Sequence, residues 1–110
     1  MTVKLGDYRD HITDEHHIQA IITDPPYNMT QLAWDNHFDP GEFWTIITPQ
    51  LAEQCVVILT AQMRLAVDLI RTATIPFRHD LVWEKPNGTG QVRHQPNRCH
   101  ELVLVFGRGT

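Results

Sequence analysis

The feature that most constrains this fold is a short apolar run that ends in two consecutive prolines. Residues 18–23 (IQAIIT) have the length and composition of a buried strand, and Asp24-Pro25-Pro26-Tyr27 follows directly. The prolines fix φ at about −65° and carry no N–H, so the turn is stiff, and Pro25 holds Asp24 in an extended conformation. We therefore expect the Asp24 carboxylate, the Pro25 carbonyl and the Tyr27 ring to converge at the carboxyl end of the strand. In parallel α/β sheets this is where ligands bind.

The rest of the chain alternates between strand and helix signals, which predicts an α/β fold. We expect strands near residues 2–5, 18–23, 55–60, 80–85 and 101–106, and longer helices near 41–53 and 61–73. The continuous apolar run at 55–59 is typical of an internal parallel strand. The sheet is expected to be mainly parallel with an antiparallel last strand, and to have an open edge or one that pairs with another chain.

Helix-start signals and apolar periodicity refine these predictions. Asp39 and Pro40 suit the N-cap and first position of the helix at 41–53, and Pro49 must kink or split it. Thr60 is predicted to cap the following helix. One stripe of that helix is expected in the core, as is Trp83. The stripe consists of Met63, Ala66, Val67 and Ile70, with Leu65 and Leu69 alongside.

Four ordered blocks of the chain resemble a known enzyme family. Asp24-Pro25-Pro26-Tyr27 is similar to the catalytic motif of the DNA amino-methyltransferases, which methylate N6 of adenine or N4 of cytosine. Gly6-Asp7 precedes it, Trp34-Asp35 follows it, and the segments 81–87 (LVWEKPN) and 100–106 (HELVLVF) close the pattern. The order resembles the permuted class whose catalytic half comes first. The resemblance implies that residues 1–110 form a single partial catalytic domain with a Rossmann-like sheet that uses S-adenosylmethionine (SAM).

The chemistry of this family accounts for the residue types of the motif. An exocyclic amino nitrogen is a poor nucleophile because its lone pair is delocalised into the ring. Its two N–H groups can donate to the Asp24 carboxylate and the Pro25 carbonyl, which leaves the lone pair free to attack a methyl group. The base must be flipped out of the duplex, and Tyr27 would stack on it. Asp24, Pro25, Pro26 and Tyr27 are therefore the candidate catalytic residues. Read without the other blocks, the tetrapeptide is equally an ordinary turn or a proline-rich ligand.

Two acidic residues are candidate contacts of the cofactor. The resemblance places Gly6-Asp7 near the adenosine part of SAM, which makes Asp7 one candidate, and Asp24 is the other. Asp7 has an equally good structural interpretation, as the N-cap of a helix over residues 8–12.

A basic segment near the end of the chain is the candidate DNA-binding surface. The net charge is −4, which does not favour nucleic-acid binding. The segment 85–98, however, contains no acidic residue, and its length makes it a candidate functional loop. The predicted DNA contacts are Lys85, Asn87, Arg93 and Arg98. A solvated basic loop is the alternative.

The resemblance also shows what the sequence lacks. The family's cofactor site centres on the glycine-rich turn Asp-Pro-Phe-x-Gly-x-Gly, and no such motif is present. We expect the chain to be the catalytic half of a restriction-modification type of methyltransferase, as a truncated phage gene, a fragment, or one half of a split enzyme that needs a second chain. The preferred reaction is adenine N6 methylation. The alternatives are N4-cytosine methylation, methylation of a protein glutamine, and a non-catalytic remnant or binding subunit.

Composition sets the remaining limits. A chain of 110 residues with 42% hydrophobic residues suits one domain. No apolar run approaches the roughly 20 residues of a membrane span, and no signal peptide is evident, so a cytoplasmic protein is expected. Cys55 and Cys99 lack metal-type spacing, and no metal site is predicted.

Overall fold

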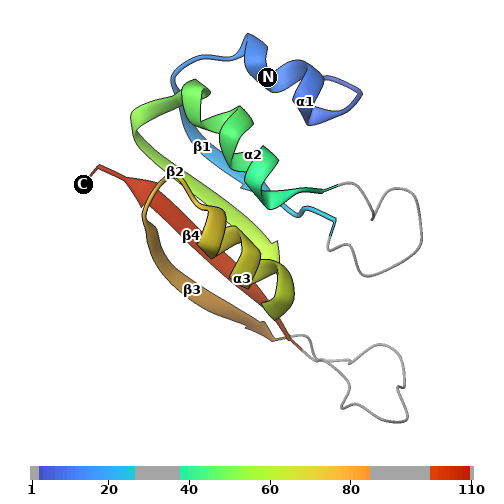
Figure 1. The fold of residues 1–110 in the computed structure, drawn as a ribbon, viewed down its shortest axis with the longest axis vertical. Helices are drawn as coiled ribbons and strands as arrows, with labels where there is room; N and C mark the ends of the chain where they lie inside the picture. Colours follow the sequence, from blue (N-terminus) through green and yellow to red (C-terminus); the bar gives the residue numbers. More distant parts are fainter. Residues whose placement is uncertain (1–2, 27–37, 85–99, 110) are drawn as a thin grey trace.

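The computed structural model describes residues 3–26, 38–84 and 100–109, which form three α-helices and one four-stranded sheet (Figure 1). The helices are α1 (Tyr8–His11), α2 (Pro40–Ile47) and α3 (Met63–Thr72). The strands are β1 (Ile18–Thr23), β2 (Leu51–Ala61), β3 (Phe77–Glu84) and β4 (His100–Arg108). Short 3-10 turns cover Ile12–Asp14 and Thr48–Gln50.

The sheet has the strand order β1-β2-β4-β3. β1 pairs with β2 in parallel, with Ile21 opposite Val57 and Thr23 opposite Leu59. β4 is antiparallel to both of its neighbours, β2 and β3. Three strands thus run one way and the last strand runs the other way, which confirms the predicted mainly parallel sheet with an antiparallel last strand.

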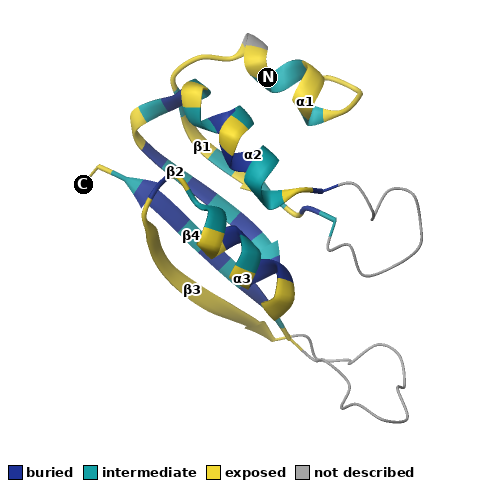
Figure 2. Cartoon of the chain, in the orientation of Figure 1, coloured by how far each residue is buried: buried dark blue, intermediate teal, exposed yellow. Residues whose placement is uncertain are grey.

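The core lies between one face of the sheet and the helices α2 and α3, which both lie on that face (Figure 2). Alternate residues of β2 and β4 point into it and are buried; they are Cys55, Val57, Leu59, Ala61, Leu102, Leu104 and Phe106. Trp44 of α2 is fully buried, its ring centroid is 4.7 Å from that of Phe106, and its Nε1–H donates to the Leu69 carbonyl of α3 at 3.0 Å. Trp44 therefore joins both helices to the sheet.

The opposite face of the sheet has no helix against it among the described residues. On β2 and β4 this face presents the half-buried residues Val56, Ile58, Val103 and Val105. On the outer strands it presents Ile22, which is 75% exposed, and Leu81, which is 55% exposed. β1 was expected to be buried. It is only partly so, because it has one neighbouring strand and a helix layer on one face.

The sequence predicted most elements but misplaced several boundaries. Asp39 caps α2 as expected, since its side chain accepts from the Glu42 N–H. The α-helix ends at Ile47, before Pro49, and β2 begins at Leu51, four residues earlier than the predicted start. The reason is that Pro49 admits a single 3-10 turn and no further α-helix.

Three other expectations were wrong. Residues 3–5 form no strand, because no described strand lies beside them to supply a hydrogen-bonding partner. α3 begins at Met63 after Gln62, so Thr60 lies within β2 and caps nothing. The predicted core stripe is rotated: Ala66 is buried with Leu65 and Leu69, but three of the four stripe residues are exposed by 41–57%, namely Met63, Val67 and Ile70.

Trp83 was also expected in the core, and it is 49% exposed. It lies on β3, whose eight residues are all exposed because this outer strand extends beyond the helix layer (Figure 2). Cys55, in contrast, is buried in β2 as predicted.

Candidate active site

A cavity of about 540 Å³ opens at the carboxyl end of β1. The start of α1 forms one wall, α2 with Phe38 forms another, and β1 with the residues that follow it forms the floor. Its volume falls in the range of about 300–1,000 Å³ that is usual for small-molecule sites. The described part of the motif lines it, namely Asp24, Pro25 and Pro26, and so does Asp7. Asp24, Pro25 and Pro26 therefore lie at a cavity beyond the strand terminus. The predicted convergence with the Tyr27 ring stays a prediction, because Tyr27 lies outside the described residues.

In the stiff turn after β1, the Asp24 side chain is exposed, whereas Pro25 is buried and Pro26 is half-buried. Asp24 Oδ1 accepts a hydrogen bond from the Thr60 hydroxyl at 2.5 Å. Thr23 lies opposite Leu59 in the parallel ladder, so the next residues, Asp24 and Thr60, lie side by side at the ends of β1 and β2.

Thr60 is a residue of the site that sequence reasoning missed. It was assigned to a helix cap because it stands just before an apolar helical stripe. Only the pairing register of β1 with β2 reveals it, because the register that aligns Ile22 with Ile58 also brings Thr60 beside Asp24.

Asp7 is held in place by α1. Its Oδ1 accepts from the Arg9 backbone N–H at 2.9 Å, which is the expected N-cap bond, and from Arg9 Nε at 3.0 Å. Its Oδ2 accepts from the Arg9 guanidinium at 2.6 Å. These hydrogen bonds from Arg9 lower the pKa of Asp7 to about 2. The capping interpretation is confirmed, and the cofactor contact stays a prediction.

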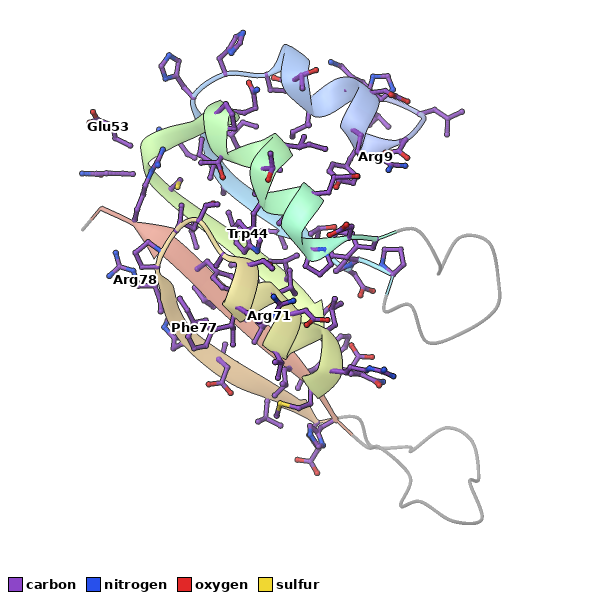
Figure 3. All side chains as sticks on the ribbon, in the orientation of Figure 1. Arg9, Trp44, Glu53, Arg71, Phe77 and Arg78 are labelled. Carbon is purple, nitrogen blue, oxygen red and sulfur yellow. The ribbon has the colours of Figure 1, made fainter. Side chains whose placement is uncertain are left out.

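Arg9 also links the two helices that flank the cavity. Its second terminal nitrogen donates to Glu42 of α2 at 2.9 Å, so one guanidinium bridges an acid on each wall. Figure 3 labels Arg9 on α1. The neighbouring Tyr8 packs its ring 6.0 Å from that of Phe43. Burial, reinforced by Glu42, raises the pKa of Tyr8 to about 12. α1 is therefore tied to α2 by both an ion pair and a ring contact.

The turn that leads into α1 requires glycine. Gly6 lines the cavity and has φ +138°, a conformation that L side chains rarely adopt. A Cβ there would also lie 2.8 Å from His11 Nε2. The Gly6-Asp7 pair thus has a structural basis: glycine makes the turn and aspartate caps the helix.

The other predicted site residues lie outside the described residues. They are Tyr27, Lys85, Asn87, Arg93 and Arg98. Within residues 3–26, 38–84 and 100–109, no group of His, Cys, Asp and Glu side chains is arranged to hold a metal ion. Among the described helices, none has the length and hydrophobicity to span a membrane.

The fold is similar to solved structures of M1.HpyAVI. The M1.HpyAVI-SAM complex matches with a TM-score of 0.63 and 18% sequence identity, over 91% of this chain and 48% of that chain. A second M1.HpyAVI structure matches with a TM-score of 0.66 and 17% identity, over 91% of this chain and 50% of that chain. The shared architecture is the fold of part of the M1.HpyAVI chain. The chain spans about half the length of the M1.HpyAVI chains.

Sequence comparisons add no relatives: no family model matches the chain, and no curated protein matches it. The likeness therefore lies in the fold, and the reaction has to be argued from the residues of the cavity.

Proposed function

We propose that this chain is the catalytic part of a SAM-dependent DNA methyltransferase that acts on N6 of adenine. The observation that carries the proposal is the position of Asp24-Pro25-Pro26. In a methyltransferase-like sheet, the motif that resembles that of the amino-methyltransferases lines a cavity of about 540 Å³ at the carboxyl end of β1. Ligands of open α/β sheets bind at this end of the strands.

The residues of the cavity suit the recognition of an amino group. The exposed Asp24 carboxylate accepts one N–H of the base, and the Pro25 carbonyl accepts the other. The nitrogen then forms a bond to the methyl carbon as the carbon–sulfur bond breaks, and it loses one proton to water. The protein contributes alignment and preorganised acceptors, with no covalent enzyme intermediate.

The cavity has the size and charge to take part of a SAM molecule. Asp7 and Asp24 line the cavity, together with the apolar side chains Ile21, Phe43 and Ile47. Bound there, SAM would supply a methyl group activated by a positively charged sulfur. We expect the isolated chain to hold it weakly, because the sequence lacks the glycine-rich turn that lets a backbone approach such a ligand closely.

A second polypeptide that supplies the missing half is part of the proposal. Among the described strands β1 is an outer one, and no described strand pairs with its other side, which leaves those backbone groups for another strand. The chain also spans only half of the M1.HpyAVI length. DNA would approach the segment that contains Lys85, Asn87, Arg93 and Arg98, and we place the activity in the cytoplasm.

Two alternatives stay open within this site. The motif also suits cytosine N4, and the preference for adenine rests on the resemblance of a motif that begins with Asp. A non-catalytic remnant or binding subunit is the alternative outside the enzymes. Methylation of a protein glutamine is less favoured, because its motif usually begins with Asn.

The test is a methyl-transfer assay on unmodified DNA, with and without a methyltransferase half that carries the glycine-rich turn. Mass spectrometry of the hydrolysed DNA distinguishes N6-methyladenine from N4-methylcytosine. Asp24→Ala should lower the rate by at least about 100-fold while the fold stays intact, because Asp24 is exposed. Asp80→Ala on β3 is the matched control and should leave the rate unchanged. Activity retained in Asp24→Ala would refute the proposal.

A further inference from the structure

The hydrogen bond between Thr60 and Asp24 occupies one oxygen of the candidate catalytic carboxylate. An ionised carboxylate only accepts, so the Thr60 hydroxyl is the donor. Thr60 Oγ1 lies 2.5 Å from Asp24 Oδ1, within hydrogen-bonding distance. Asp24 Oδ2 is therefore the oxygen left for a substrate.

Thr60 is well placed to fix the orientation of this carboxylate. The terminal torsion of aspartate is broad and roughly two-fold, so an exposed Asp24 would rotate freely without a partner. Threonine is β-branched and stiff at χ1. Thr60 also belongs to the central strand β2, where it lies opposite Val103 of β4. A rigid scaffold thus holds the donor, while Asp24 lies at the end of an outer strand.

We propose that Thr60 is a positioning residue, which holds the Asp24 carboxylate so that Oδ2 faces the amino group of the base. This inference rests on the proposed function. The predicted consequence is a preference for ligands with an exocyclic amine. Loss of the hydroxyl removes that preference and leaves the contacts with the rest of the base unchanged.

The experiment titrates the full chain with two nucleosides and follows amide resonances by NMR. The probes are 2′-deoxyadenosine and the purine 2′-deoxyriboside that lacks the 6-amino group, so turnover is not required. The wild-type chain should bind deoxyadenosine about 2- to 10-fold more tightly, as one or two net hydrogen bonds imply. Thr60→Val should abolish this ratio, and Thr60→Ser should restore it. Thr45→Val is the matched control, because the Thr45 hydroxyl bonds to Gly41 within α2.

Each outcome has a distinct meaning. An unchanged ratio in Thr60→Val, with wild-type discrimination intact, would overturn the role of Thr60 and leave the proposed function standing. A ratio of one in the wild-type chain, or no binding of either nucleoside, would overturn this inference, whereas the methyl-transfer assay with the completing half decides the proposed function separately. A purely structural role for Thr60 would weaken the binding of both nucleosides equally, which also contradicts the proposal.

Discussion

Within residues 3–26, 38–84 and 100–109, β1 and β3 are the two outer strands of the sheet, and they differ in how their outer edges are protected. β3 (FRHDLVWE) carries Arg78, His79, Asp80 and Glu84. β1 (IQAIIT) carries no charged residue and no proline. Charges and prolines are the usual means by which proteins keep a free edge from pairing with another chain. β3 therefore has the composition of a solvent-exposed edge strand, and β1 has the composition of a strand that pairs with another strand on its outer side.

The same contrast appears in what the two strands lead to. The carboxyl end of β1 enters the cavity with Asp24 and Pro25, and its open face exposes Ile22. β3 pairs only with β4 in the described part of the chain and lines no part of that cavity. The unprotected edge and the candidate site thus occur on one strand. This is the arrangement expected if the polypeptide that completes the site also pairs with β1.

The largest predicted effect is a loss of stability of the hydrophobic core, on which both outer strands depend. Trp44 is fully buried and connects α2 to α3 and to Phe106 of β4. Trp44→Ala should lower the free energy of unfolding by about 3–5 kcal/mol, measured by urea denaturation. Amide exchange should speed up in β1 and β3 together. Faster exchange in one outer strand alone would show that the two edges belong to separately stable units.

Matched substitutions on the two open edges test the comparison itself. Ile22→Lys on β1 and Leu81→Lys on β3 both replace exposed apolar residues, so each should change the unfolding free energy by no more than about 0.5 kcal/mol. A lysine on β1 should weaken association with a methyltransferase half that carries the glycine-rich turn several-fold in sedimentation experiments, because β1 carries the unprotected edge. The lysine on β3 should have little effect. Equal weakening by both substitutions would remove the distinction between the edges.

The smallest predicted effect is a change in the pKa of Asp7, which caps α1 beside the cavity near β1. Arg9 lowers the pKa of Asp7 from 3.8 to about 2. A lowered carboxyl pKa contributes stability that is fully present above about pH 4 and is lost as the pH falls through about 2. Arg9→Ala should return the pKa of Asp7 toward 3.8, as measured by carboxyl NMR titration. Arg71→Ala removes the exposed ion pair with Asp68 and is the control. It should leave the pKa of Asp7 unchanged.

Local signals in the sequence predicted the fold well where chemistry at neighbouring positions decides it. Asp39 and Pro40 fixed the start of α2, Pro49 fixed its end, and Asp7 capped α1. Asp24-Pro25-Pro26 marked the end of β1 and the floor of the cavity. In each case a side chain or ring restricts its own backbone, so no distant residue is needed to make the prediction.

Features that depend on pairing between distant strands were not predictable. Val3 and Leu5 have strand-like side chains, but the described chain offers no strand beside them, and they stay exposed. The role of Thr60 depends on the register between β1 and β2. A pattern in one segment contains none of this information.

Calorimetric titration of SAM into the purified chain tests the central claim most directly. The claim is that the cavity beside β1 is one part of a methyltransferase site and that another polypeptide completes it. We predict weak or undetectable binding by the chain alone. The advantage of holding a methyl donor beside the base, worth roughly 7–11 kcal/mol of a reaction barrier, would then be absent without the completing half. Stoichiometric binding at micromolar concentration would show that the cofactor site is already complete and would contradict this account.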